Sequence, residues 1–599
     1  MPRIGASGQP APFWKHLSPW VPILAGLVLI AVISAWEVGV DDLVAGDEGY
    51  YGIMARNARA SPAQLVSPSL SPMGPPGDKP FLYPLLLAAS LEIGGVDETP
   101  MRLLTIFFAV LIGPLLFLVA RALGMGEEGL YAGVIYLFSP LVVYSGRRVA
   151  AEVPLTAFGL AGLWLFLEAL NRKSLTRALL AGGAWGLAFL CKLWLIVPIM
   201  SAAIAGSLPS LWPTERGPER RRFGWQACLA AGLAFLAIGS SQLVLVALFV
   251  PEDLSHWKDI YWGFSLTNRL QGENFADYWH HPFSYYFLIA ARTAGMWLPL
   301  MLAGLVALAT EATRAGGQSR TARVIFFWLV PLVLISMFSV KSGNYLKPFF
   351  PALFLSAGIG FSWMIQLARD RLGARRSAVF AVALAGMAVI VSQISIRLPA
   401  GRIAVQSPFT LLLQLAWVVA IACVALGKLA SARGRGSRWL LVSCLAASLL
   451  AGVGRDIQLV RTHDHVTHYQ LLSRALAPSL ASVPPQQACF FAPEWPSLAF
   501  YSYRSGRYWE SPYVPADPDS VRRSLRSDEP WFFVTDVPVA GMYGGLPDSL
   551  SRSTIGAEGM RLRALRSHES SDSGAPPEPK FLIVFMNQAM ADRGERKLH

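Results

Sequence analysis

Charged residues are scarce in this chain. Only 15% of its 599 residues are Asp, Glu, Lys or Arg, whereas a soluble protein carries roughly a quarter. Hydrophobic residues make up 54% of the chain, and its mean hydropathy is +0.44. Surface-to-volume scaling does not allow water-soluble domains to hide so much apolar side chain. The shortage of charge therefore excludes a water-soluble or disordered protein and predicts an integral membrane protein.

Cysteine is also rare. The five cysteines are odd in number and contain no C-x-x-C pair, which argues against a disulfide-stapled fold or a cysteine zinc site. The net charge of +13 is typical of a membrane protein with Lys and Arg concentrated in its cytoplasmic loops. We therefore expect no nucleic-acid partner.

Long apolar runs fill most of the first 454 residues. A helix of about 20 such residues crosses the hydrocarbon core of a bilayer. The sequence predicts a polytopic α-helical membrane protein with about thirteen transmembrane helices. These are expected over residues 20–40, 101–123, 129–145, 150–170, 176–190, 194–211, 226–250, 285–309, 324–340, 348–368, 378–396, 408–429 and 439–454.

Basic residues cluster in alternate loops. The clusters lie at residues 172–177, 216–222, 314–323, 369–376 and 433–438. Because Lys and Arg concentrate on the cytoplasmic side, we expect the N-terminus in the cytoplasm and the C-terminal segment outside. The expected location is a bacterial inner membrane.

The composition divides the chain into two predicted domains. Residues 1–454 form a transmembrane domain, whose first external loop (41–100) contains a short apolar helix from Pro80 to Gly94. From residue 455 to 599 the composition resembles a soluble protein, with β-rich runs at 488–491, 498–503, 531–535 and 581–585. We expect this segment to be an external α/β domain.

Acidic and basic residues from distant loops are expected on the outer membrane face. They include Asp47 and Glu48 after the first span, Lys79 before the short helix, Glu152 at the start of a span, and Lys192, Lys341 and Lys347 at other outer turns. Ionisable groups near membrane depth are costly and are candidates for function. Outward-facing cations suit a phosphate, and carboxylates suit a proton acceptor or a metal.

Seven short motifs occur in a defined order. They are Asp47-Glu48, Asp78-Lys79-Pro80, Arg102, Glu152, Gly186-Leu187-x-x-Leu190-x-Lys192, His281-Pro282-x-x-Tyr285-Tyr286 and Lys341-x-x-x-Tyr345-x-x-Pro348. In this order they resemble the membrane-embedded GT-C glycosyltransferases. The nearest resemblance is to protein O-mannosyltransferases and to the bacterial transferases that add aminoarabinose to lipid A.

The chain departs from the aminoarabinose transferases at three positions. Tyr50 stands where that family usually has Arg, Lys347 where it usually has an apolar residue, and Glu152 where it usually has Asp. These departures leave the particular sugar, hexose or pentose, and the acceptor open.

The resemblance implies a reaction and a set of site residues. A sugar would move from a polyprenyl-phosphate donor, such as undecaprenyl phosphate, to a glycolipid or protein acceptor at the external membrane face, with inversion. Asp47 would be the base, with Glu48 and Glu152 as supporting carboxylates. The residues expected to bind the donor phosphate are Lys79, Arg102, Lys192, Lys341 and Tyr345.

The resemblance also implies a divalent-metal site that the reaction does not require. Asp78 with His281 or His280 would hold zinc or manganese. Two alternatives from other classes are a secondary transporter and a lipid-handling protein of the envelope. Charges at outer loop ends, rather than at the midplane, and the lack of an inverted repeat argue against transport.

Overall fold

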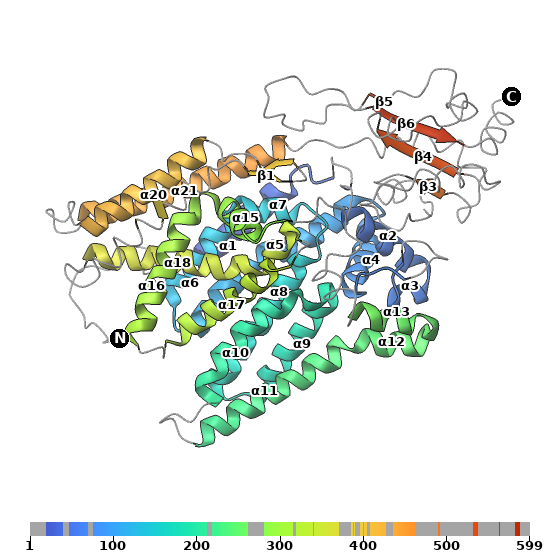
Figure 1. The fold of residues 1–599 in the computed structure, drawn as a ribbon, viewed down its shortest axis with the longest axis horizontal. Coiled ribbons are helices and arrows are strands. Elements are labelled where there is room, and N and C mark those ends of the chain that lie inside the picture. The colour runs from blue at the N-terminus through green and yellow to red at the C-terminus, as the bar shows by residue number, and fades with distance from the viewer. Residues whose placement is uncertain are drawn as a thin grey trace.

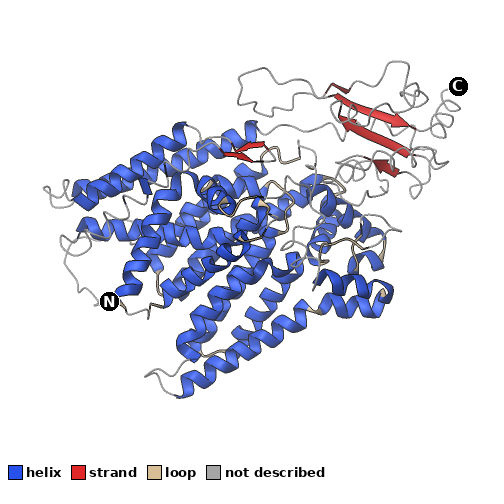
Figure 2. Cartoon of the chain, viewed as in Figure 1, coloured by secondary structure: helices blue, strands red, loops and turns tan. Residues whose placement is uncertain are grey.

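The computed structural model describes most of the chain up to residue 462. It describes residues 20–39, 43, 47–69, 76–211, 218–261, 281–315, 319–338, 341–369, 396–398, 401–403, 408–426 and 435–462, isolated positions between 382 and 389, and four short strands between 489 and 586. Helices dominate these residues (Figures 1 and 2).

The helices run in the following order. They are α1 (Trp20–Ala35), α2 (Asp47–Ala60), α3 (Pro62–Val66), α4 (Leu82–Gly94), α5 (Glu98–Ala122), α6 (Gly126–Leu137), α7 (Pro140–Gly146), α8 (Glu152–Arg172), α9 (Leu175–Lys192), α10 (Val197–Leu211), α11 (Pro218–Gly239), α12 (Ser241–Phe249), α13 (Leu254–Asp259), α15 (Tyr285–Ala294), α16 (Leu298–Arg314), α17 (Arg320–Ser336), α18 (Phe350–Arg369), α20 (Pro408–Leu426) and α21 (Arg435–Thr462). Short 3-10 helices include η2 (Leu193–Ile196) and η7 (Gly343–Phe349).

Several helical segments are long and apolar enough to cross a membrane. The described residues contain 7 such segments, or 8 if the bent pair α6 and α7, with 56° between its helices, forms one span. This confirms a polytopic helical membrane protein. The predicted range 176–190 and most of the range 194–211 fall within one helical segment, Leu175–Leu208. The total of about thirteen stays a prediction, because most of residues 378–396 lie outside the described residues.

Apolar side chains on the outside of the bundle show which surfaces suit lipid. On α11, Leu229, Leu233 and Leu236 are all more than half exposed, and their spacing places them on one helix face. In water such a stripe would be unfavourable, whereas in a bilayer it contacts acyl chains.

Local signals in the sequence explain where important helices begin and end. Asp97 caps α5 by accepting a hydrogen bond from the Thr99 amide, and Ser174 caps α9 in the same way from the Arg177 amide. Between α8 and α9, Lys173 adopts a left-handed backbone with φ of 51° and ends α8. The result is a tight antiparallel hairpin of α8 and α9, with the basic residues Arg172, Lys173 and Arg177 at its turn.

The first long loop forms a cluster of short helices. The predicted apolar helix from Pro80 to Gly94 is confirmed as α4, which packs against α2 (Figure 1). Inside this contact the rings of Tyr51 and Tyr83 meet edge to face, with centroids 4.8 Å apart. Because α4 also packs against α5 and α9, this cluster is held against the long helices.

Strands are few in the described residues. The hairpin β1 (Ile396–Leu398) and β2 (Gly401–Ile403) is antiparallel. A second sheet has the order β3-β4-β6-β5, with β3 parallel to β4 and the other neighbours antiparallel. Its strands are β3 (Cys489–Phe491), β4 (Trp531–Asp536), β5 (Leu562–Arg563) and β6 (Phe581–Met586).

Three of those strands lie where the sequence predicts β-rich runs, namely β3, β4 and β6. The run expected at 498–503 lies outside the described residues. The helix α21 continues past the predicted domain boundary to Thr462. The division into a transmembrane domain (1–454) and an external domain (455–599) stays a prediction.

Candidate active site

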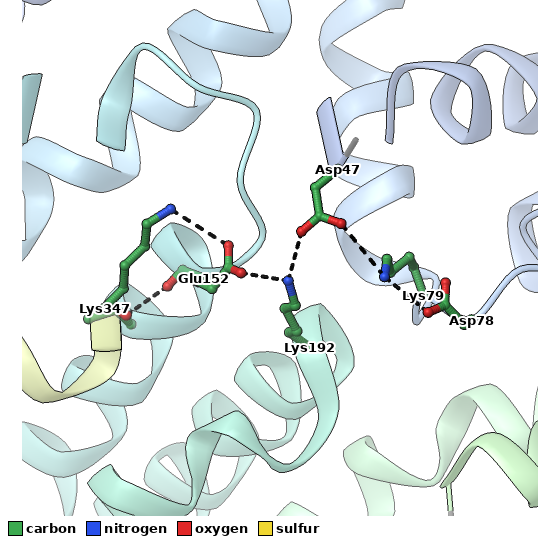
Figure 3. A network of polar contacts seen from close by, with 7 residues as sticks. Asp47, Asp78, Lys79, Glu152, Lys192 and Lys347 are labelled. Atoms are coloured by element: carbon green, nitrogen blue, oxygen red, sulfur yellow. Dashed lines mark hydrogen bonds and ion pairs between the residues drawn. The ribbon is translucent and has the colours of Figure 1, made fainter. Parts of the chain in front are cut away.

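Six ionisable side chains form a network in which positive and negative charges alternate (Figure 3). In order, the members are Asp78, Lys79, Asp47, Lys192, Glu152 and Lys347. Each interior member lies between two groups of opposite charge. The members come from α2, the segment before α4, α8, α9 and η7, so sequence-distant elements assemble the network. We call these six side chains the ion-pair network.

The hairpin of α8 and α9 supplies the centre of the network. Glu152 is the first residue of α8 and Lys192 is the last residue of α9. Because the two helices are antiparallel and similar in length, their free ends meet. Lys192 Nζ donates to Glu152 Oε1 at 2.5 Å. The carboxylate of Glu152 is 0% exposed, so this ion pair is shielded from water and salt.

The backbone directly after Lys192 is strained. Leu193 has a φ of 40°, a conformation that residues other than glycine rarely adopt. It lies where α9 ends and η2 begins. Strained backbone of this kind is found preferentially at functional sites. The strained backbone at Leu193 is therefore a further reason, besides the charged side chains, to place an active site at Lys192.

Asp47 links the hairpin to the first external loop. It is the first residue of α2, where a carboxylate interacts favourably with the helix dipole. Its Oδ2 accepts a hydrogen bond from Lys192 Nζ at 3.1 Å, and its Oδ1 lies 3.7 Å from Lys79 Nζ. Lys79 also donates to Asp78 Oδ2 at 3.0 Å. Asp47 therefore lies between two ammonium groups, as Figure 3 shows.

The two lysines control the ionisation of Asp47. Burial raises the pKa of the Asp47 carboxyl, but attraction to Lys192 and Lys79 outweighs burial and holds that pKa well below its usual range. Asp47 is therefore negatively charged at every physiological pH. While both lysines contact it, it is also a weak base, because a low pKa means a low affinity for protons.

Lys347 is one of the outer charges expected from the sequence, but no role in the site is predicted for it, and the structure connects it to the network. It lies in η7, and its Nζ is 3.8 Å from Glu152 Oε2. A signal was present in the sequence, because Lys347 occupies a position where the aminoarabinose transferases usually have an apolar residue. A lysine beside an apolar turn is commonly explained by snorkelling toward water, and only the fold shows its carboxylate partner.

Glu48 and Arg102 pair with each other, next to the network. Arg102 donates to the carbonyl of Val38 at 2.9 Å and lies 3.5 Å from Glu48 Oε2. Glu48 Oε1 accepts from the backbone amide of Val149 at 3.1 Å. These contacts connect the end of α1, the start of α2 and the segment before α8. Their visible effect is to hold the loops that carry Asp47 and Glu152.

Lys341 and Tyr345 occupy different surroundings. Lys341 is almost fully buried, and its ammonium donates to the carbonyl oxygens of His281 and Phe338. The ring centroid of Tyr345 lies 5.9 Å from Lys192 Nζ, at the range of a cation–π contact. Tyr345 therefore adjoins the network, whereas the contacts shown for Lys341 fix the backbone before η7.

The described residues form no metal site with three or more protein ligands. They contain no group of three or more His, Cys, Asp and Glu side chains placed to hold an ion. Asp78 is paired with Lys79, and the His281 ring stacks on Tyr285 with centroids 4.0 Å apart. His280 lies outside the described residues. The predicted metal site at Asp78 with His280 or His281 stays a prediction.

Comparisons with known proteins agree with the motifs. Residues 78–238 match the model of the family described as dolichyl-phosphate-mannose-protein mannosyltransferase. This range contains Asp78, Lys79, Glu152 and Lys192, whereas Asp47 and Lys347 lie outside it. No curated protein matches the chain.

One protein of known structure shows the same fold. The crystal structure of ArnT from Cupriavidus metallidurans bound to undecaprenyl phosphate matches with a TM-score of 0.59 at 16% identity, covering 94% of this chain and 97% of that one. The apo form of the same protein also has a TM-score of 0.59, with 95% and 98% covered. An oligosaccharyltransferase from Archaeoglobus fulgidus has a TM-score of 0.48 at 13% identity, covering 87% and 70%. The resemblance to GT-C glycosyltransferases is confirmed at the level of fold.

Proposed function

We propose that this protein is an inverting glycosyltransferase that moves a sugar from a polyprenyl-phosphate donor to an acceptor at the external face of the membrane. The observation that carries the proposal is the ion-pair network, in which three lysines and three carboxylates from distant parts of the chain meet. The fold supports it, because a protein with this fold was solved with undecaprenyl phosphate.

In this proposal Lys79 and Lys192 bind the donor phosphate. A phosphate leaving group needs no proton from an acid, because it is already stable as an anion. It needs cations that strengthen their contact as negative charge grows during bond cleavage. Lys79 and Lys192 both contact Asp47 and both retain some exposure, so an incoming phosphate competes with Asp47 for the same ammonium groups.

This competition converts Asp47 from a weak base into a useful one. Without donor, the two lysines hold the pKa of Asp47 well below its usual range. When the phosphate takes over part of their charge, the attraction on Asp47 weakens and its proton affinity rises. The base is then strengthened only when the donor is bound, which disfavours reaction steps before the donor arrives.

The reaction is a single displacement at the anomeric carbon. The acceptor oxygen forms a bond to that carbon as the bond between the carbon and the phosphate oxygen breaks. The proton of a hydroxyl acceptor passes to Asp47, and polyprenyl phosphate leaves with the bonding electron pair. Attack opposite to the phosphate inverts the anomeric configuration, as in the base half of an inverting glycosidase.

Other members of the predicted site have supporting roles in the proposal. Glu152 balances the charge of Lys192 and keeps it oriented. Glu48 and Arg102 hold the loops on either side of the site, and Tyr345 adjoins Lys192. Lys341 orders the turn before η7 through its two carbonyl contacts.

The hairpin supports an orientation in the membrane. Its turn carries Arg172, Lys173 and Arg177, and its opposite end carries Glu152 and Lys192. Since basic loops favour the cytoplasm, the network faces outward, with the N-terminus inside and residues 455–599 outside a bacterial inner membrane. The proposed acceptor is a glycolipid or a protein that reaches this outer face.

The test is transfer by the purified full-length protein in lipid nanodiscs. It is supplied with undecaprenyl-phosphate sugars labelled in the sugar and with lipid A or an acceptor peptide. We expect labelled acceptor and free undecaprenyl phosphate in equal amounts. Lys79→Ala should abolish both products, whereas Lys258→Ala, which changes an exposed lysine on α13, should leave them unchanged. No bond cleavage with any donor would contradict the proposal.

The same preparation distinguishes the alternative functions. A secondary transporter would accumulate a solute in proteoliposomes without cleaving the donor. A lipid-handling protein would move a labelled lipid between leaflets, also without cleavage. Either result, in the absence of sugar transfer, would favour the corresponding alternative.

A further inference from the structure

The two ends of the ion-pair network differ in how well their charge is compensated. At one end Asp78 accepts a hydrogen bond from Lys79 at 3.0 Å and is about one-third exposed, so water can also solvate it. At the other end Lys347 is 10% exposed, and its nearest opposite charge is 3.8 Å away. That separation is too long for a hydrogen bond. The positive end is therefore the undercompensated one.

The neighbours of Lys347 leave capacity for an additional ligand. Among the described residues no hydrogen bond from Lys347 Nζ is present, and Glu152 Oε2, which faces it, accepts none. Glu152 is also shared, because its other oxygen pairs with Lys192 at 2.5 Å. One buried carboxylate thus faces two ammonium groups.

A further cation lies near this end. Arg148, four positions before Glu152 in the chain, carries another positive charge, and its guanidinium lies 4.3 Å from the ring centroid of Tyr144. The Lys347 end therefore combines an ammonium and a guanidinium against a shared carboxylate. Buried charges of one sign that lack close partners are costly unless a ligand of opposite sign binds to them.

We infer that Lys347 forms a second anion subsite, which binds a carboxylate or phosphate group carried by a substrate in addition to the donor phosphate. This inference rests on the proposed function. The anionic group has two possible sources, either the transferred sugar or the acceptor. In both cases the subsite favours an acidic substrate and disfavours a cationic amino sugar, which Lys347 and Arg148 would repel.

The experiment measures selectivity with matched substrates. One series compares undecaprenyl-phosphate glucuronic acid with undecaprenyl-phosphate glucose, which differ in a carboxylate. The other series keeps one donor and compares bisphosphorylated lipid A with its dephosphorylated form. For each pair the ratio of kcat/KM is measured in the wild-type protein, Lys347→Met, Lys347→Arg and the exposed control Lys258→Met.

We expect one series to show a preference of roughly 10- to 100-fold for the anionic member, the usual effect of a charged hydrogen bond. Lys347→Met should reduce that ratio to near one, because kcat/KM for the anionic member should fall further than kcat/KM for the neutral member. Lys347→Arg should keep part of the preference, because it keeps the charge. The series that responds identifies the sugar or the acceptor as the source.

Two results would overturn the inference. One is an equal kcat/KM for the anionic and the neutral member in both series. The other is an equal loss of kcat/KM for both members in Lys347→Met, because that loss would show a purely structural role for Lys347. Failure of the proposed function looks different. In that case the wild-type protein transfers no sugar from any donor, and binding of plain undecaprenyl phosphate does not depend on Lys79.

Discussion

Asp47 and Glu152 each lie between two lysines, yet their exposure gives them different capabilities. The Asp47 side chain is 32% exposed, whereas the Glu152 side chain is fully buried. A substrate hydroxyl can approach Asp47, while Glu152 is reached only by side chains of the protein. For this reason we assign the base to Asp47 and the positioning of lysines to Glu152.

Changing Asp47 to Asn separates binding from chemistry. Asp47→Asn removes the base, so turnover with a hydroxyl acceptor should fall roughly 10²–10⁴-fold. It also removes the competitor for Lys79 and Lys192, so affinity for undecaprenyl phosphate should stay equal or increase a few-fold. Binding and single-turnover measurements check both effects. Glu92→Gln, an exposed carboxylate paired with Arg59, is the control, and weaker donor binding in Asp47→Asn would contradict the competition.

The same competition predicts two different pH dependences. In the free enzyme the pKa of Asp47 is well below its usual range, so Asp47 stays ionised as the pH falls. The value of kcat/KM should therefore decrease only at strongly acidic pH. In the donor complex the phosphate weakens the pull of the lysines, so the acid limb of kcat should lie at higher pH, by about one unit or more. Full pH profiles measure both limbs. Coincident limbs would show that the donor leaves Asp47 unaffected.

At the scale of elements, the hairpin of α8 and α9 determines the position of two network residues. α9 packs closely along both α8 and α11 (Figure 1). Two adjacent glycines on α9 differ in their surroundings. A Cβ at Gly182 would overlap the carbonyl oxygen of Ala231 on α11, whereas a Cβ at Gly183 would meet nothing within 4 Å.

These glycines provide a matched pair of substitutions. Gly182→Ala should separate α9 from α11, lower the melting temperature and reduce activity, because Lys192 ends the displaced helix. Gly183→Ala should leave activity intact and stabilise the protein slightly, by about 0.5–1 kcal/mol, since alanine favours helix. Thermal unfolding in detergent and transfer assays compare the two. Equal behaviour would mean that the contact between α9 and α11 is not close.

The two carboxylates at opposite ends of α8 provide a second comparison. Glu152→Ala leaves Lys192 and Lys347 without their shared buried partner and should destabilise the protein by about 3–5 kcal/mol. Glu168→Ala breaks a pair with the exposed Arg172 on the same helix and should cost less than about 1 kcal/mol. Thermal unfolding measures both. Similar melting temperatures would show that Glu152 is not a buried counter-charge.

At the scale of the whole molecule, the orientation in the membrane decides which compartment supplies the acceptor. In a cysteine-free background, Ser255→Cys on α13 should react with a membrane-impermeant thiol reagent in intact cells. Lys173→Cys, at the turn of the α8 and α9 hairpin, should react only after permeabilisation. The two positions are exposed in the structure, so labelling in the opposite pattern would reverse the predicted orientation.

The sequence by itself determined the class of protein and most of the elements. Apolar runs of membrane-spanning length predict helices because the bilayer provides no hydrogen bonds to backbone groups. The apolar segment from Pro80 to Gly94 is too short to cross a bilayer, which predicts a short helix that is buried or lies in the interface, and the structure has α4 there. Asp47, Lys79, Glu152 and Lys192 were recognised because a charge beside an apolar run is costly unless it has a use.

Only the tertiary structure decided which charges meet. The sequence places Glu48 beside Asp47 in one motif, but the fold turns Glu48 toward Arg102 and the Val149 amide and Asp47 toward two lysines. It also connects Lys347 to Glu152 across 195 positions of the sequence. Apolar patterning sets helices one at a time, whereas ion pairs depend on how helix ends meet, and that geometry arises from packing between helices.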